Sequence, residues 1–326
     1  MRIGLFAIGL ALMGGTALAQ TAPRPDPDAA RRMEEMRAAD AKRADSVGTG
    51  PFAAIKEADP TLPDHTVYRP ADFSKLNGQK LGVVIWGNGG CAADGASARH
   101  HLAQIASYGY LVVAPGKIYS GPGALPRPAA ATGRGPDPAT GQLPPPATSA
   151  QDVLKGLDWA LAENGREGSR YKGLIDPAQV AVAGHSCGGL QAIEAGADKR
   201  IRTVLVHNSG VFNDGKQAIS GMTVSKDMLK SLHTPTLYVL GGESDIAWLN
   251  GSDDFARIDH VPVALVYADV GHGGTFREEN GGDVGRFAVA WLNWQLRGDA
   301  EAGKLFKGAE CGLCNDPKWT IERKGL

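Results

Sequence analysis

The stretch Val180-Ala-Val-Ala-Gly-His-Ser-Cys-Gly-Gly-Leu190 decides how the rest of the sequence is interpreted. It starts as an apolar run, passes through Gly184-His-Ser-Cys-Gly188, and continues into residues that predict a helix. A strand, a sharp turn and a helix form the setting in which a G-x-S-x-G pattern presents a nucleophile. Glycines suit this turn because a side chain at either flank would collide with the neighbouring strand or helix. The pattern predicts Ser186 at the tip of the turn, with its hydroxyl exposed.

Apolar strands and amphipathic helices alternate on both sides of this turn. We expect strands at residues 80–86, 110–114, 202–206, 236–240 and 263–267, and helices at 97–108, 150–164 and 287–296. Ser97 is the expected N-cap of the first of these helices. The alternation predicts an α/β fold, with a mostly parallel sheet covered by helices on both faces. In such sheets, ligands bind where the carboxyl ends of the strands open into loops.

Two of the expected strands end in residues suited to acid–base chemistry. Gly241-Gly-Glu-Ser-Asp-Ile-Ala247 follows the strand at 236–240, and Val270-Gly-His-Gly-Gly-Thr275 follows the strand at 263–267. The chain order Ser186, Asp245, His272 is the order of a hydrolase triad on this kind of sheet. The histidine would take the serine proton, and the aspartate would orient and stabilise the imidazole.

Each triad position has a competitor. Glu243 is the rival acid, and we prefer Asp245 because the loop must turn before a carboxylate can reach the histidine. His207 ends a strand near the site but precedes the acid, so we interpret it as pocket lining.

A catalytic serine also needs two backbone donors that face the developing negative charge. One is the amide of Cys187, at the start of the elbow helix. The other is expected in Trp86-Gly-Asn-Gly-Gly-Cys91, where Asn88 is the first choice and Gly89 the next. This glycine-rich loop lacks the nucleotide-binding patterns, so no cofactor is predicted. Trp86 and Trp248 are candidates for an apolar wall of the substrate site.

These residues identify a resemblance. From about residue 66 to residue 300 the chain resembles an α/β-hydrolase, and it is similar to the dienelactone-hydrolase-like and cutinase-like branch. That branch includes bacterial polyester hydrolases and acetyl-ester hydrolases. The matching motifs are Gly184-His-Ser-Cys-Gly188, Glu243-Ser-Asp-Ile-Ala247 and the loop that starts Trp86-Gly-Asn. The resemblance implies Ser–Asp–His roles but no particular substrate. The chain departs from relatives in having Cys after the serine, and from dienelactone hydrolases in having serine where they use cysteine.

The four cysteines allow three pairings if they are oxidised. In the fold that the resemblance implies, the oxyanion loop and the elbow are neighbours, so we expect Cys91 to pair with Cys187. Cys311 and Cys314 would then close a small loop in the C-terminal tail. A C-x-x-C redox site is the weaker alternative because this motif lies in a polar tail. No second ligand pair has metal spacing, so no metal is predicted.

Residues 1–19 predict a secretory signal peptide, with an apolar core that is too short to span a membrane and a cleavage site at Ala17-Leu-Ala19. Residues 20–50 predict a solvated or helical arm, and 51–326 one domain with a Pro/Gly-rich insert at 115–148. The formal net charge of −1 gives no basic field for nucleic acid. We therefore expect a secreted or periplasmic monomer with no nucleic-acid or membrane partner.

The sequence thus predicts an exported serine esterase that acts through an acyl-enzyme on a small-molecule or polymer-borne ester. An amidase or acyl-transferase would use the same residues. A non-catalytic binding protein on a hydrolase fold and a thiol redox protein built on the C-terminal cysteines are the alternatives from other classes.

Overall fold

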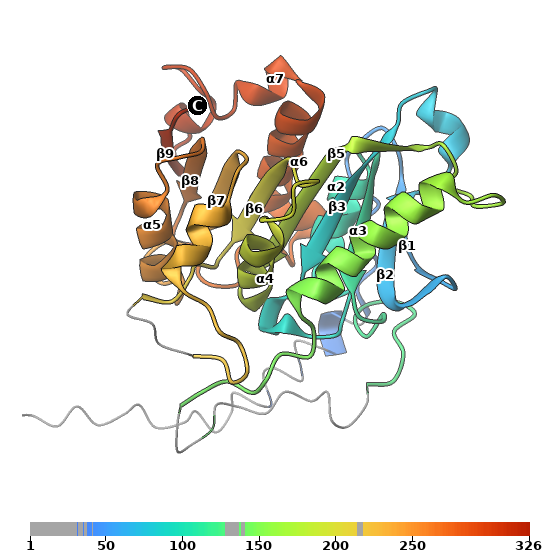
Figure 1. Ribbon diagram of the computed structural model, residues 1–326, viewed down its shortest axis with the longest axis horizontal. Coiled ribbons are helices and arrows are strands. Elements are labelled where there is room, and N and C mark those ends of the chain that lie inside the picture. The colour runs from blue at the N-terminus through green and yellow to red at the C-terminus, as the bar shows by residue number, and fades with distance from the viewer. Residues whose placement is uncertain are drawn as a thin grey trace, which may run out of the picture. The chain divides into compact units, whose positions relative to one another are not determined.

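Hydrophobic strands assemble into one mixed sheet in the computed structural model, which describes residues 31, 35, 38–40, 42–127, 137, 141–213 and 218–326. Within these residues the sheet has nine strands, in the order β1-β2-β4-β3-β5-β6-β7-β8-β9 (Figure 1). The strands are β1 (Ala54–Asp59), β2 (Leu62–Pro70), β3 (Leu81–Gly87), β4 (Tyr110–Pro115), β5 (Ile175–His185), β6 (Thr203–His207), β7 (Thr236–Leu240), β8 (Val263–Tyr267) and β9 (Thr320–Lys324).

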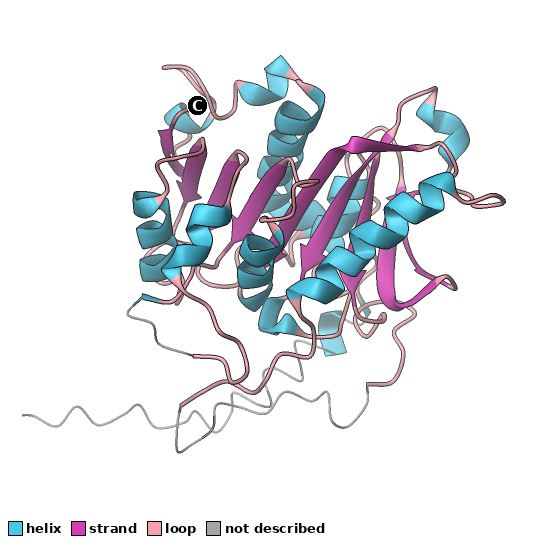
Figure 2. Ribbon diagram, viewed as in Figure 1, coloured by secondary structure: helices cyan, strands magenta, loops and turns pink. Residues whose placement is uncertain are grey.

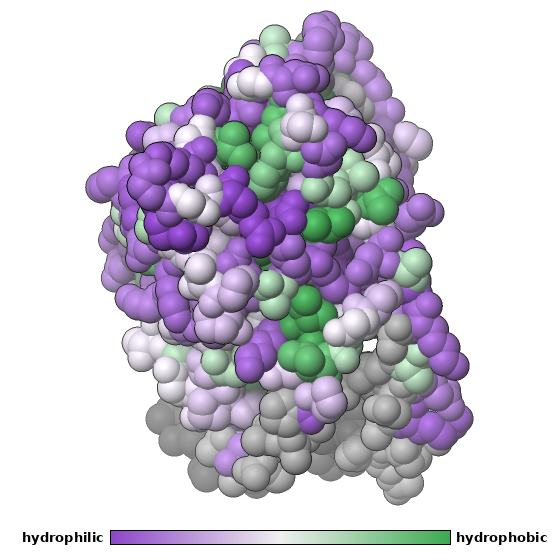
Figure 3. Space-filling model, turned by 90° about the vertical axis from the view of Figure 1, so that its right-hand side faces the viewer, coloured by the Kyte–Doolittle hydropathy of each residue, from purple (hydrophilic) through white to green (hydrophobic). Residues whose placement is uncertain are grey.

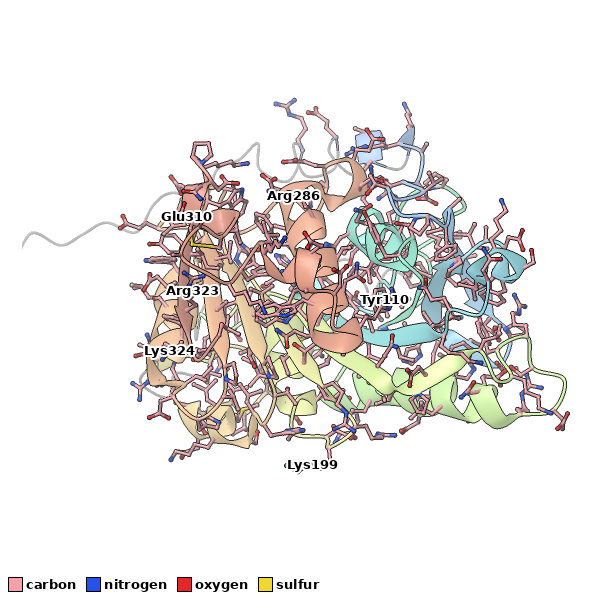
Figure 4. All side chains as sticks on the ribbon, turned by 90° about the horizontal axis from the view of Figure 1, so that it is seen from above. Tyr110, Lys199, Arg286, Glu310, Arg323 and Lys324 are labelled. Carbon is pink, nitrogen blue, oxygen red and sulfur yellow. A yellow bond between two sulfur atoms is a disulfide. The ribbon has the colours of Figure 1, made fainter. Side chains whose placement is uncertain are left out.

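The six central strands confirm the predicted parallel sheet. Neighbouring strands from β4 through β8 all pair in parallel. Both edges are antiparallel: β1 and β2 form a hairpin beside β4, and β9 pairs with β8. The sequence pattern does not predict these three edge strands. Arg323 and Lys324 place charges along the β9 edge (Figure 4), which discourages pairing with another chain.

Helices cover both faces of the sheet, as expected (Figure 2). They are α2 (Arg99–Ala106), α3 (Ala150–Gly165), α4 (Cys187–Ala195), α5 (Trp248–Arg257), α6 (Gly282–Arg297) and α7 (Ala300–Gly303). One buried cluster joins the sheet to α3, α4 and α5, and the other joins it to α2 and α6. Residues of β3 alternate between the two: Val83 and Ile85 face the first, and Val84 and Trp86 face the second. Tyr110 of β4 lies under α6, where its hydroxyl is 2.9 Å from Asn293 Oδ1 (Figure 4).

Two helix boundaries differ from the prediction. Helix α2 begins at Arg99 with Ala98 as its N-cap and no side-chain capping bond, so the prediction that Ser97 caps it is wrong. Helix α6 begins at Gly282, five residues before the expected start, because the glycine-rich segment ahead of it also winds into a helix. Helix α3 starts as expected, and Ser149 and Asp152 form a capping box at its N-terminus.

The end of the predicted N-terminal arm belongs to the folded body. Asp40–Leu326 is one compact unit. The buried Arg99 pairs with Asp40 at 2.6 Å and with Asp45 at 2.9 Å, and Ser46 Oγ lies 2.8 Å from His100 Nδ1. Asp45 and Ser46, which fall within the expected arm, therefore contact α2 of this unit. The proposed signal peptide lies outside the described residues.

The surface beside β1 and β2 is mainly hydrophilic, with apolar side chains in separate clusters (Figure 3). Among the described helices, none has the length and apolar character needed to cross a membrane.

Candidate active site

The turn at the end of β5 has the strained geometry that its sequence predicts. Ser186 has φ 54° and ψ −124°, in the positive-φ region that side chains rarely adopt. A Cβ on Gly184 would lie 2.0 Å from the carbonyl oxygen of Gly188. A Cβ on Gly188 would lie 2.1 Å from the backbone of Gly87. Both glycines are therefore required by close backbone packing, and Ser186 remains partly exposed at the tip.

Three loops bring Ser186, His272 and Asp245 together at the carboxyl edge of the sheet. The Ser186 hydroxyl lies 2.8 Å from His272 Nε2, and His272 Nδ1 lies 2.6 Å from Asp245 Oδ1. The imidazole thus connects the hydroxyl to the carboxylate. The His272 side chain is 30% exposed, whereas that of Asp245 is fully buried. A serine, a base and a group that orients the base within hydrogen-bonding reach can support nucleophilic catalysis.

Four hydrogen-bond donors stabilise the charged form of the Asp245 carboxyl group. Burial alone would raise the pKa of its carboxyl group, but hydrogen bonds outweigh that effect and lower the pKa below its usual value. Besides His272, the donors are the amide of Ala247 at 2.9 Å, the amide of Gly241 at 3.0 Å and the side chain of Asn208 at 2.8 Å. A buried carboxylate with this shell keeps the imidazole in one tautomer.

The competing residues do not take these positions. Glu243 is exposed, and His272 Nδ1 donates its hydrogen bond to Asp245 instead. His207 is fully buried in a ring cluster with Trp86 and His101, at centroid distances of 5.8 and 5.2 Å. Trp86 is also fully buried. The prediction that Trp86 and His207 line the substrate site is therefore wrong, because neither can touch a substrate there.

Trp248 is half-buried and packs on Tyr267 with ring centroids 4.9 Å apart. Its neighbours Ile246 and Leu249 are 80% and 72% exposed, so apolar side chains reach solvent beside the acid loop. A role for Trp248 in binding substrate stays a prediction.

His185, the residue before the serine, contacts the loop of His272. Its Nε2 donates to the backbone carbonyl of His272 over 2.9 Å, and the two rings lie 5.3 Å apart. On its other side, a Cβ on Gly89 would lie 2.6 Å from its Nδ1. Burial lowers the pKa of His185 to about 4, so the ring is neutral at neutral pH. His185 therefore separates the oxyanion-loop candidate from the histidine loop.

The loop after β3 packs backbone to backbone on the elbow. A Cβ on Gly188 would lie 2.6 Å from the amide nitrogen of Asn88, which places that amide beside the first turn of α4. The buried side chain of Asn88 donates to the carbonyls of Ala92 at 2.9 Å and Pro115 at 2.6 Å. Cys187 is the first residue of α4, and amides in a first turn lack partners within the helix. Oxyanion binding by Asn88, Gly89 and Cys187 stays a prediction.

Both expected cysteine pairs are present as disulfides. Cys91 and Cys187 are joined with their Cα atoms 5.2 Å apart, which ties the loop after β3 to the elbow helix. Cys91 has a positive φ of 46°, and its carbonyl accepts from the amides of Ala147 and Thr148 at 3.1 and 3.0 Å. The end of the 115–148 insert is thus attached at the same point. Cys311 and Cys314 form the second bond.

The segment after β6 supplies contacts that the sequence analysis did not assign. Asn208 reaches Asp245, and Ser209 Oγ donates to the carbonyl of Ser186 over 2.7 Å. The signal was available, because this segment also follows the carboxyl end of a predicted parallel strand. Of this part of the chain, only His207 is among the residues that the sequence predicts for the site.

Comparisons with models of known protein families and with curated protein sequences give no match for this chain. The described residues contain no group of three or more His, Cys, Asp and Glu side chains arranged to hold a metal ion.

Proposed function

We propose that this protein is an exported serine carboxylic-ester hydrolase of the α/β-hydrolase fold. The observation that carries the proposal is the continuous chain from the Ser186 hydroxyl through His272 to Asp245, with contacts of 2.8 and 2.6 Å. The strained backbone of Ser186 supports it, because such conformations concentrate at functional sites. Two disulfides are consistent with export to an oxidising compartment.

In the proposed reaction, His272 takes the proton of Ser186 as the oxygen attacks the ester carbonyl. The amides of Cys187 and Asn88 stabilise the negative charge on the carbonyl oxygen. His272 then gives its proton to the leaving alcohol, and an acyl-enzyme forms on Ser186. Water enters with His272 again as the base, which releases the acid and restores the serine. Asp245 remains ionised throughout and stabilises the imidazolium.

The partly exposed serine and histidine favour substrates that approach from solvent, such as a small ester or an ester carried on a polymer. The same machinery would serve an amidase or an acyl-transferase. We place the ester first because an alkoxide leaves more easily than an amide nitrogen, so esters are the least demanding substrates for an open triad.

Hydrolysis of p-nitrophenyl acetate, butyrate and octanoate by the mature protein tests this proposal. The wild type should turn over at least one ester, and Ser186→Ala should lose the activity by about 10³-fold or more. Ser74→Ala is the matched control, because Ser74 is exposed and its hydroxyl contacts only the nearby Asp72. Equal activity of wild type and Ser186→Ala would rule out the serine mechanism. Inactivity of the wild type on esters, amides and alternative acyl acceptors would favour a binding protein.

A further inference from the structure

The last residue of β6 and the two residues after it contact parts of all three triad loops. The carbonyl of His207 accepts from the amide of Ser186 over 3.0 Å. Ser209 Oγ donates to the carbonyl of Ser186 over 2.7 Å. Between them, the side chain of Asn208 contacts both the acid and the histidine loop. The segment 207–209 therefore contacts the backbone of Ser186, the side chain of Asp245 and the loop that carries His272.

Asn208 makes two contacts with one amide group. Its Nδ2 donates to Asp245 Oδ2 over 2.8 Å and to the carbonyl of Gly271 over 3.1 Å. Gly271 immediately precedes His272, so the amide bridges the acid and the backbone that carries the base. Both neighbours of Nδ2 are pure acceptors, which fixes the orientation of the carboxamide.

The backbone of Asn208 explains why this residue type stands here. Its φ is 45°, and Asn and Asp tolerate the left-handed region better than other residues with a side chain. Glycine would fit the backbone but supply no donor. Aspartate would fit the backbone but place a second carboxylate against Asp245, where like charges disfavour joint ionisation. Asparagine satisfies both requirements, and the residue is only 1% exposed.

On the basis of the hydrolase function proposed above, we infer that Asn208 is a positioning residue, which holds Asp245 and the His272 loop in one fixed relation. It touches no reacting atom. Its amide and the amide of Gly241 both donate to Oδ2 of Asp245, while Oδ1 accepts from His272 and from the amide of Ala247. Loss of the amide would remove one of the two donors to Oδ2, so the carboxylate would be less firmly fixed and would keep more negative charge to attract the imidazolium.

Two variants of the mature protein test this inference. Asn208→Gly keeps the left-handed backbone and deletes the amide, and Asn208→Asp keeps the shape and replaces the donor by a carboxylate. We expect each to lower kcat by about 10- to 100-fold, the change that corresponds to one hydrogen bond to a charged group. KM should stay within about twofold, because the amide does not touch the substrate. In Asn208→Gly the acid limb of the kcat/KM profile should move to higher pH.

The matched control is Asn77→Gly. Asn77 is also an asparagine in the left-handed region, with φ 49°, but it is exposed at the end of a short helix before β3. It should keep the wild-type kcat and pH profile. Wild-type kcat in Asn208→Gly, or an unchanged acid limb with a uniform loss of activity in both Asn208 variants, would overturn the inference. Failure of the proposed function would be separate, because Ser186→Ala would then be as active as the wild type.

Discussion

The disulfide between Cys91 and Cys187 should contribute both stability and activity. It closes a loop with a sequence separation of 96, and both cysteines are buried. In the chain-entropy treatment, a crosslink of this span stabilises the folded state by about 4 to 5 kcal/mol. For a domain of this size each kcal/mol corresponds to roughly 2–4 °C in Tm. Cys91→Ala/Cys187→Ala should therefore melt about 10 °C or more below the wild type.

The same variant should lose turnover at temperatures where it is still folded. The bond fixes the loop that carries Asn88 against the helix that begins at Cys187, and both amides are proposed to bind the oxyanion. Removing one such donor typically costs about 10²–10³-fold in kcat, so a donor that is only loosened should cost less than this, about 10-fold.

The control is Cys311→Ala/Cys314→Ala, which removes a bond with a sequence separation of only 3 in the C-terminal tail. Its entropic effect should be smaller, about 1.5 kcal/mol, and its kcat should match the wild type. Calorimetry and p-nitrophenyl ester turnover at 25 °C measure the two effects. If Cys91→Ala/Cys187→Ala keeps both the Tm and the kcat of the wild type, the reasoning about this loop is refuted.

Three other perturbations test separate features of the site. Gly188→Ala should yield little folded protein or lose most of its turnover, because the new Cβ would lie 2.1 Å from the Gly87 backbone. Circular dichroism measures the folding of the variant, and ester turnover measures its activity. Wild-type values of both would contradict the close packing of Gly188 on Gly87. Hydrogen bonds lower the pKa of the Asp245 carboxyl below its ordinary value of 3.8. The stability that Asp245 contributes is therefore present above about pH 4, and it is lost as pH falls through the pKa of the folded state. Urea unfolding measured at a series of pH values should show that Asp245→Asn loses less stability in acid than the wild type. Burial lowers the pKa of His101 to about 3, so near pH 6.5 and below the unfolded chain binds a proton at this residue that the folded chain does not bind. The free energy of unfolding should therefore decrease as pH drops from 6.5. His101→Phe should make this decrease with pH less steep, and an unchanged pH dependence would show that His101 protonates in the folded state.

The centre of the fold follows from periodicity in the sequence. Parallel strands such as β7 and β8 are continuous apolar runs, because both of their faces are covered, and their predicted bounds agree with the structure. The edge strands could not be predicted in this way, because only a strand that is covered on both faces needs a continuous apolar run. Strands β1 and β9 are half-exposed, with burial that alternates or is incomplete, so their sequences lack a long apolar run.

The positions of the predicted triad residues could be derived because each follows a strand end, and topology brings strand ends to one edge. The position of a residue at a strand end does not predict whether its side chain is buried. Trp86 and His207 also lie at strand ends, yet their side chains turn into the buried cluster shared with α2 and α6. Which face a terminal strand residue uses depends on the pleat of the sheet, and a register change of one residue reverses it.

The role of Asn208 could not be predicted from the sequence. A single asparagine after a strand has many structural uses, and its importance here comes from a positive φ and two acceptors supplied by loops 37 and 63 residues away. Such contacts depend on tertiary packing and leave no local sequence pattern.

Covalent labelling of the mature protein with a fluorophosphonate tests the central claim most directly. We expect one adduct, mapped by peptide mass spectrometry to Ser186, with labelling strongly reduced in His272→Ala and absent in Ser186→Ala. The Ser74→Ala control should label like the wild type. No adduct on the folded wild type, or an adduct on another residue that persists in Ser186→Ala, would contradict an assembled serine nucleophile at this site.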